Sequence, residues 1–233
     1  MAQAPDPVAA LALARSRDGS RPGARGDGYR LALVIEGGGM RGVIAGGMVS
    51  ALDHLGLVPA FDAVYGTSAG ACAGAYLLAG QALRGTRIFY EDINNGRFLS
   101  VARVFRRRPV MNVDYLIDHV MTAIKPLDTA RLMASAIPLT MMATRVADAA
   151  PVALTGFRRH GEVMQALRAS TRVPLLGGPP VAGPGGAMLV DGALSAPVAT
   201  ALAEAEGATH VLALITRPDA QRIAGGGGGP MLR

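Results

Sequence analysis

The sequence predicts a single α/β domain with a mainly parallel central sheet flanked by helices. Short apolar runs, typical of strands buried on both faces, alternate along the chain with longer helix-like stretches. This alternation favours parallel strands joined by right-handed crossovers. The length of 233 residues, half of them hydrophobic, suits one domain with a sizeable core and is too short for two full domains. Because aromatic residues make up 4% and Trp is absent, Ala, Leu, Val and Met must form most of the core.

Strands are expected where short apolar runs lie between turn signals. The first run is wholly apolar, and a Gly-rich turn follows it. In chain order, the expected strands are Leu31–Ile35, Phe61–Tyr65, Pro138–Val146, Pro151–Thr155, Met188–Val190 and His210–Thr216.

Helices are expected in the longer stretches, several of which end at glycine or before proline. Gly56 ends the first, and the third stops before Pro126. The expected helices are Val43–Leu55, Ala69–Leu83, Val113–Ile124, Glu162–Ala169 and Pro197–Glu206.

Composition divides the chain into three parts. Residues 1–29 are expected to form a disordered leader, because their second half is polar and Gly-rich and cannot bury a core. Residues 30–218 are the expected folded domain. Residues 219–233 are expected to be a flexible tail, since they contain the run Gly225–Gly229 followed by Pro230.

Charge and cysteine content narrow the classes of function. The net charge of +6 comes almost entirely from arginine, since Lys125 is the one lysine among 23 basic residues. Such a charge permits several kinds of anionic partner without choosing among them. The single cysteine, Cys72, excludes a disulfide within the chain and a Cys-based zinc site, and four scattered histidines leave little room for another metal. We therefore expect no metal and no cofactor.

Neither a secretory signal nor a membrane span is convincing in the sequence. Residues 1–14 lack a basic beginning, and Asp6 interrupts them. The uncharged stretch Ala63–Leu83 is long enough to span a bilayer, but its glycines and polar residues make it only weakly apolar. We expect a cytoplasmic protein that can meet a membrane peripherally.

A Gly-rich turn directly after the first expected strand opens a helix. It consists of Gly37, Gly38, Gly39, Met40, Arg41 and Gly42. Consecutive glycines let backbone N–H groups converge on one point, and the helix start adds partial positive charge, so the turn suits an anion or an oxyanion. The turn also satisfies G-x-G-x-x-G, and a dinucleotide site is an alternative. That site needs an acidic residue near the end of the second strand, whereas Asp62 lies at its beginning and a Walker lysine is absent. A purely structural turn is the third interpretation.

A second turn, Gly66-Thr67-Ser68-Ala69-Gly70, lies between an expected strand and an expected helix. This is the context of a nucleophile elbow, which holds a serine in a strained, exposed position at a helix N-terminus. In a chain with 31 glycines, G-x-S-x-G alone is a common pattern, but here a loop of the oxyanion type precedes it. Ser68 is therefore the candidate nucleophile.

A serine nucleophile needs a base, and two candidates lie downstream. Asp191 ends a short apolar strand in Asp191-Gly192-Ala193, where strand ends gather in an α/β sheet, although an Asp-Gly pair also simply starts a turn. His210 would complete the order Ser68, Asp191, His210 of an α/β-hydrolase triad. In that fold several strands precede the elbow and the histidine follows a late strand. Here one strand precedes the strand that leads into Ser68, and His210 opens a strand.

Together, the three motifs resemble those of the patatin-like phospholipase family over most of residues 30–217. The family motif G-G-G-x-[RK]-G is similar to residues 37–42, G-x-S-x-G to residues 66–70 and D-G-[AG] to residues 191–193. The resemblance implies a three-layer α/β sandwich, with Ser68 as nucleophile, Asp191 as its direct proton acceptor and the 37–42 loop as oxyanion hole. It also implies calcium-independent hydrolysis of a lipid ester, with neither a cofactor nor a nucleic acid as partner. A triad esterase and a nucleotide-binding module are the alternatives.

The segment Arg97–Arg108 interleaves apolar and basic residues. Wound as a helix, it would gather four apolar side chains on one face, Phe98, Val101, Ala102 and Phe105. Arg103 and Arg107 would lie largely opposite. This composition suits a segment that lies in a membrane interface. A solvated basic face over ordinary core contacts is the other interpretation.

Overall fold

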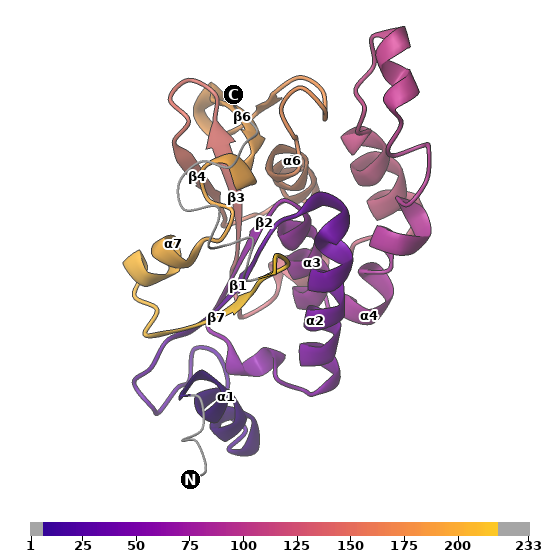
Figure 1. Ribbon diagram of the computed structural model, residues 1–233. Coiled ribbons are helices and arrows are strands. Elements are labelled where there is room, and N and C mark those ends of the chain that lie inside the picture. Colours follow the sequence, from indigo (N-terminus) through magenta and orange to yellow (C-terminus); the bar gives the residue numbers. More distant parts are fainter. Residues whose placement is uncertain (1–6, 219–233) are drawn as a thin grey trace.

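Seven strands form one mixed sheet at the centre of the structure, a computed structural model that describes residues 7–218 (Figure 1). The strands are β1 (Leu31–Ile35), β2 (Ala63–Thr67), β3 (Leu139–Arg145), β4 (Pro151–Leu154), β5 (Val181–Ala182), β6 (Met188–Asp191) and β7 (His210–Leu214). Hydrogen bonds join them in the order β5-β6-β3-β2-β1-β7, and β4 also pairs with β3.

The central strands β7, β1, β2 and β3 are parallel. Leu31 of β1 pairs with His210 of β7, and Ile35 pairs with Gly66 of β2. Every residue of β1 and β2 is buried, as expected of apolar strands that are covered on both faces. The predicted α/β fold with a mainly parallel sheet is confirmed.

The strands β2 and β6 meet end to end on the same edge of β3. A strand residue has one neighbour on either edge, and β4 occupies one edge of β3 along Met141–Thr144. On the other edge, Met142 pairs with Thr67 at the end of β2, and the next residue, Ala143, pairs with Asp191 at the end of β6. Because β6 is antiparallel to β3, the C-terminal ends of β2 and β6 point at each other.

Helices cover both faces of the sheet, which makes three layers. Side chains alternate along a strand, so Leu33 and Ile35 face one core and Val34 faces another. The first face carries α2 (Gly42–His54), α3 (Ala69–Leu78) and α6 (His160–Ser170). The second carries α7 (Thr200–Ala205). All residues of α3 are buried, so this helix lies inside the molecule rather than on its surface.

Two expected helices differ in their detail, while the other expected elements lie within about three residues of the observed bounds. The stretch 69–83 is divided into α3 and α4 (Ala82–Gly85), because Gly80 adopts a left-handed φ of 65° that ends the first helix. The helix expected from residue 113 covers Tyr115–Ile124 and winds with wide π-type turns. A short helix, α5 (Thr129–Met133), follows it.

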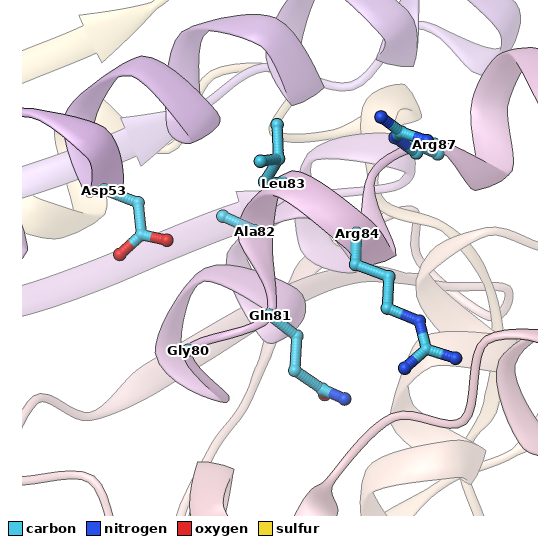
Figure 2. A pocket seen from close by; sticks show the side chains of 7 residues that line it. All are labelled: Asp53, Gly80, Gln81, Ala82, Leu83, Arg84 and Arg87. Atoms are coloured by element: carbon cyan, nitrogen blue, oxygen red, sulfur yellow. The ribbon is translucent and has the colours of Figure 1, made fainter.

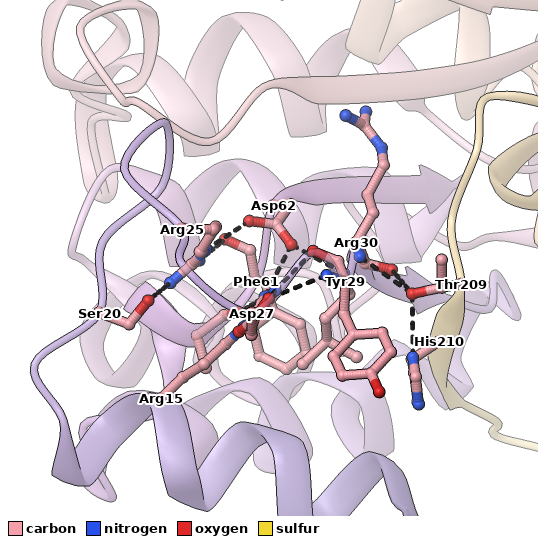
Figure 3. Close-up of polar contacts among 12 residues, drawn as sticks. Arg15, Ser20, Arg25, Asp27, Tyr29, Arg30, Phe61, Asp62, Thr209 and His210 are labelled. Carbon is pink, nitrogen blue, oxygen red and sulfur yellow. Dashed lines mark hydrogen bonds and ion pairs between the residues drawn. The ribbon is translucent and has the colours of Figure 1, made fainter.

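The expected disordered leader is wrong for residues 7–29. Pro7–Arg17 forms the helix α1, and Arg15 is buried although it is charged. Its guanidinium donates hydrogen bonds of 2.7 and 2.8 Å to the two carboxylate oxygens of Asp27 and one of 2.7 Å to Asp62 (Figure 3). Charge-assisted hydrogen bonds thus order a polar segment that has little apolar surface to bury.

Asp62 joins this segment to the sheet. One of its oxygens accepts a 2.7 Å hydrogen bond from Arg25 (Figure 3), and the other accepts one of 2.8 Å from the N–H of Leu31 at the start of β1. Burial raises the pKa of Asp62, but the hydrogen bonds from Arg25, Leu31 and Arg15 more than offset it, and the pKa lies below its ordinary value. The hydrogen bond from Arg15 lowers the pKa of Asp27 as well.

The segment Arg97–Arg108 does not form the single helical face that its pattern predicts. Phe98 is only 3% exposed and packs into the core, and Leu99 forms a β-bridge with Met111. Between Leu99 and Met111 the chain makes an excursion that projects from the body of the molecule (Figure 1). Only Val101–Arg106 is helical there, as a 3₁₀ helix.

The expected flexible tail, residues 219–233, lies outside the described residues. Within residues 7–218, no helix combines the length and the apolar character that crossing a bilayer requires.

Candidate active site

Ser68 lies in the tight turn between β2 and α3 with a φ of 53° and a ψ of −122°. Positive φ is costly for a residue with a side chain, so surrounding contacts must hold this conformation. Glycines make the turn possible. A Cβ on Gly70 would lie 2.2 Å from the carbonyl oxygen of Ile35, and one on Gly66 would lie 2.6 Å from the Cα of Ala71. The G-x-S-x-G spacing therefore follows from how closely the strand, the turn and β1 approach.

The hydroxyl of Ser68 donates a 2.7 Å hydrogen bond to Oδ2 of Asp191. Both side chains are buried. The other carboxylate oxygen, Oδ1, accepts a 2.8 Å hydrogen bond from the N–H of Ala193. Each oxygen of Asp191 thus has one partner, and the serine is the only side chain within residues 7–218 that binds the carboxylate.

Backbone contacts hold Asp191 opposite the serine. Its N–H donates to the carbonyl of Arg172 at 2.9 Å, and its own carbonyl accepts from the hydroxyl of Thr144 at 2.8 Å. The residue after Asp191 must be a glycine because the backbone of β3 lies against it. A Cβ on Gly192 would be 2.3 Å from the carbonyl oxygen of Met142. The Asp-Gly pair serves close packing against β3, in addition to starting a turn.

Burial raises the pKa of Asp191 to about 6, and the hydrogen bonds from Ala193 and Ser68 only partly offset this effect. At neutral pH the carboxylate is ionised and its pKa is close to the ambient pH. A general base is most efficient under that condition.

The loop 37–42 lies directly against the serine. A Cβ on Gly37 would be 2.9 Å from the Cβ of Ser68 and 2.8 Å from the carbonyl oxygen of Thr67. Gly39 has a left-handed φ of 56°, and α2 begins at Gly42. Among the described residues, the N–H groups of Gly37 and Gly38 donate to no acceptor. The structure therefore places free backbone donors of a glycine loop beside the predicted nucleophile.

Sequence reasoning missed two residues that brace this loop. Glu36 is buried at the end of β1 and accepts a 3.0 Å hydrogen bond from the hydroxyl of Thr216, which also lies 3.1 Å from the carbonyl oxygen of Gly37. Arg217 pairs with the other oxygen of Glu36 at 3.2 Å. An acidic residue that ends an otherwise apolar strand was a visible signal in the sequence, whereas Thr216 had none.

Ser170 was also missed. It is buried in the last turn of α6, and its hydroxyl oxygen accepts a 2.9 Å hydrogen bond from the N–H of Ser68. This bond links the strained turn to a helix 102 residues further along the chain.

His210 and Asp62 do not join the site. His210 opens β7 opposite Leu31, at the N-terminal end of the parallel strands, whereas Ser68 follows their C-terminal end. Five residues of strand separate the two ends, or about 17 Å. His210 lies 2.9 Å from the hydroxyl of Thr209, and Asp62 is held by arginines at the same distant end. The triad and the dinucleotide site therefore lack the geometry that each requires.

Cys72, four residues after Ser68, is fully buried, and burial raises its pKa to about 12. The thiol is therefore protonated and behaves as a small core residue. Within residues 7–218, His, Cys, Asp and Glu side chains do not gather in a group of three or more that could hold a metal ion.

Two cavities lie near the helices that surround the site. The larger, of about 870 Å³, is lined by α6, by the end of β4 and by the β5–β6 hairpin. It reaches Ala169 and Leu189, the neighbours of Ser170 and of Val190 in β6. The smaller, of about 370 Å³, lies at the C-terminal end of α3 beside Asp53 and Arg84 (Figure 2). Ser68 is at the other end of α3, about 15 Å away along the helix axis, so only the larger cavity is near the site.

A family model for patatin-like phospholipases matches residues 33–203, most of the chain. The chain belongs to the patatin-like phospholipase family. The matched residues include Ser68, Asp191 and the 37–42 loop.

Two further proteins are similar to this patatin-like chain. The uncharacterized protein YjjU of Escherichia coli (strain K12) is 29% identical over 147 residues, which cover 62% of this chain and 40% of YjjU. The crystal structure of VipD from Legionella pneumophila has a TM-score of 0.46 and 14% sequence identity, and the match covers 70% of this chain and 46% of VipD. The chain thus spans less than half the length of either protein.

Proposed function

We propose that this chain hydrolyses the carboxylic ester bonds of lipids, with Ser68 as nucleophile and Asp191 as its base. The observation that carries the proposal is the 2.7 Å hydrogen bond from the Ser68 hydroxyl to a buried carboxylate that binds no other side chain among residues 7–218. The strained backbone of Ser68 supports it, because strain concentrates at functional sites.

In the proposed reaction, Asp191 takes the hydroxyl proton as the oxygen of Ser68 attacks the ester carbonyl carbon. The carbonyl π electrons move to its oxygen and form a tetrahedral oxyanion. When the intermediate collapses, the bond to the alcohol breaks, and the alcohol leaves with the proton from Asp191. Water then attacks the acyl-serine, Asp191 takes its proton, and the acid leaves as the serine regains a proton.

The glycine loop is the proposed oxyanion hole. Gly37 lies against Ser68, and the free N–H groups of Gly37 and its neighbour Gly38 are the proposed donors to the charge that develops on the carbonyl oxygen. The start of α2 at Gly42 adds partial positive charge to the same region. The hydrogen bonds among Glu36, Thr216 and Gly37 would keep these donors in position before substrate arrives.

The cavity of about 870 Å³ is the proposed site of the acyl chain. Leu189 lines it and lies two residues before Asp191 on the same face of β6, about 7 Å along the strand. Most of its inner lining is apolar or small, including Leu154, Phe157 and Ala166. A hydrocarbon chain would displace water from this surface, which favours binding.

A fluorophosphonate probe tests the proposal directly, because an activated serine displaces its fluoride and becomes covalently labelled. We expect the full chain to be labelled on Ser68, as located by mass spectrometry of its peptides. Labelling should disappear in Ser68→Ala and fall sharply in Asp191→Asn, while His210→Ala should label normally. Labelling that needs His210 would instead favour a triad esterase. A folded chain that takes up no probe would favour a binding protein.

A further inference from the structure

The excursion between Leu99 and Met111 carries a concentrated positive charge. We call residues 99–109 the finger, since they project from the body of the molecule (Figure 1). Five arginines lie in the finger or next to it, Arg97, Arg103, Arg106, Arg107 and Arg108. The sequence has no acidic residue from Ile93 to Val113, so nothing on this stretch neutralises them.

The finger also exposes large apolar side chains to solvent. Phe105 is 89% exposed and Val101 is 73% exposed, and Leu99 and Val104 are exposed beside them. Apolar side chains scattered singly on a surface are ordinary, but a cluster of them rimmed by arginine is typical of an interaction site.

A second segment completes this apolar surface. The loop 173–178 carries Leu175, which is 97% exposed. The loop contacts the base of the finger, because the N–H of Met111 donates a 2.8 Å hydrogen bond to the carbonyl of Leu176. Leu176 is exposed as well. The two segments are 65 residues apart in the sequence, so no local pattern reveals that they share one surface.

Leu175 is held in its exposed position at a cost in backbone strain. Its φ is 65°, a conformation that a leucine rarely adopts. Arg172 fixes the loop. One of its guanidinium nitrogens donates a 2.6 Å hydrogen bond to the carbonyl of Gly177, and another donates a 2.7 Å hydrogen bond to Asp114. A leucine that is both strained and almost fully exposed contributes nothing to the core, which points to a partner outside the molecule.

The same loop begins beside the proposed base. The carbonyl of Arg172, the residue before the loop, accepts the hydrogen bond from the N–H of Asp191. The apolar surface therefore lies on the side of the molecule where the reaction is proposed to occur.

We infer that the finger and the loop 173–178 together form a docking surface for a bilayer that contains anionic phospholipid. This inference rests on the proposed lipid hydrolysis and names the surface that delivers its substrate. The arginines complement anionic headgroups, while Phe105, Val101 and Leu175 enter the boundary between headgroups and acyl chains. A second copy of the chain fits less well, because two such faces would bring ten arginines together.

Co-sedimentation with vesicles tests the inference, and it is best done in the Ser68→Ala background, so that hydrolysis does not alter the lipid. The vesicles consist of phosphatidylcholine alone or with phosphatidylglycerol. The charge variant is Arg106→Glu, Arg107→Glu and Arg108→Glu. The apolar variant is Phe105→Ser with Leu175→Asn, since asparagine tolerates positive φ. The matched control, Arg17→Glu, Arg21→Glu and Arg84→Glu, makes the same change of net charge at exposed positions elsewhere.

We expect the parent protein to bind anionic vesicles and to bind more weakly as salt is raised to 1 M. The charge variant should lose at least about 100-fold in binding, since each arginine near an anionic surface accounts for about fivefold. The apolar variant should lose the binding that persists at 1 M salt, and the control should bind like the parent. When the same substitutions are made in the protein that keeps Ser68, the charge variant, the apolar variant and the control should each cleave a soluble short-chain ester at the parent's rate.

Equal binding by all four proteins would overturn the inference, as would tighter binding to a single-stranded oligonucleotide or to an acidic protein than to anionic vesicles. The outcome is separable from the proposed function. If the parent binds vesicles but cleaves no ester, the docking surface stands and the hydrolase proposal fails. If the parent cleaves the soluble ester but binds no vesicle, the hydrolase proposal stands and the docking surface fails.

Discussion

Gly37 and Ser68 lie so close that any side chain on the glycine would meet the Cβ of the serine at 2.9 Å. The two residues come from different strand ends, β1 and β2, which are hydrogen-bonded neighbours in the sheet. The contact also involves the carbonyl oxygen of Thr67 at 2.8 Å, which is backbone and cannot turn away. The turn after β1 and the turn after β2 therefore form one unit.

Gly37→Ala should lower ester turnover by about 100-fold, because the methyl group would push the loop and its N–H groups away from the serine. Gly47→Ala is the matched control, since a Cβ on Gly47 meets nothing within 4 Å. It should leave turnover unchanged and raise stability slightly, as Gly-to-Ala changes inside helices do. Steady-state kinetics on a soluble ester measure both. Normal turnover in a folded Gly37→Ala protein would show that the oxyanion is bound elsewhere.

Ser68→Ala and Asp191→Asn should each reduce ester hydrolysis by at least about 1,000-fold, because one removes the attacking oxygen and the other the proton acceptor. The double variant should be no slower than either single one, since the two groups act as a unit. His210→Ala should retain nearly full activity because His210 lies at the other end of the sheet. A loss in His210→Ala as severe as that in Ser68→Ala would contradict the proposed pair.

Activity should fall as the pH drops through about 6, where Asp191 becomes protonated. The raised pKa of Asp191 also makes the stability of the fold depend on pH, and stability falls as the pH rises. The folded state holds this proton more tightly than the unfolded chain, so ionisation of Asp191 costs stability as the pH rises from about 4 to about 6. Asp191→Asn avoids that cost. We expect the Tm of Asp191→Asn, relative to the Tm of the parent, to be higher at pH 7 than at pH 4, as measured by thermal melts at the two pH values. A constant difference between the two Tm values would argue against the raised pKa.

Gln165→Trp should shorten the acyl chains that the protein accepts. Gln165 of α6 lines the cavity of about 870 Å³, and its side chain reaches the carbonyl of Ala182 on the other wall, so an indole at this position would occupy the cavity without disturbing the core. We expect kcat/KM to fall about tenfold for esters of twelve or more carbons and to stay unchanged for butyrate. Ala123→Trp, at an exposed position on the helix Tyr115–Ile124, is the control. An unchanged chain-length profile would place the acyl chain outside this cavity.

Arg15→Ala should destabilise the fold by about 3 kcal/mol, because it leaves the partly buried carboxylates of Asp62 and Asp27 without their shared cation. The free energy of unfolding in urea measures this loss. Arg17→Ala, at an exposed position in the same helix, should change stability by less than about 0.5 kcal/mol. As the pH falls through the ordinary range of aspartate, the parent should lose stability, because both carboxylates have lowered pKa values when folded. Equal stability of the two variants would mean that the leader is not fastened by Arg15.

All the strands except the two-residue β5, and the proposed reactive pair, could be predicted from the sequence because their signals are local. Apolar runs such as Leu31–Ile35 show a strand buried on both faces, and the glycines around Ser68 and after Asp191 show where backbones must approach closely. The contacts that were missed are long-range. Thr216 reaches Glu36 across 180 residues, so no short pattern contains both partners.

Arg15 and Phe98 show the same limit in another form. The polar composition of the leader predicted disorder, because composition does not reveal that Asp62, 47 residues away, would pair with Arg15. The spacing of Phe98 predicted that it shares a helical face with Phe105. Instead, Phe98 fills the core while Phe105 faces solvent, because the chain turns between them.

The meeting of β2 and β6 on one edge of β3 has a consequence for the order in which the protein is made. The proposed nucleophile and its proposed base are 123 residues apart, and β6 is among the last strands to be synthesised in the described part of the chain. A nascent chain that has emerged up to β5 already contains Ser68, the glycine loop and the parallel strands β1, β2 and β3, but no carboxylate opposite the serine. Under the proposed mechanism, the growing polypeptide thus carries an inert hydroxyl until Asp191 leaves the ribosome, and a chain that stalls earlier cannot attack the lipids around it.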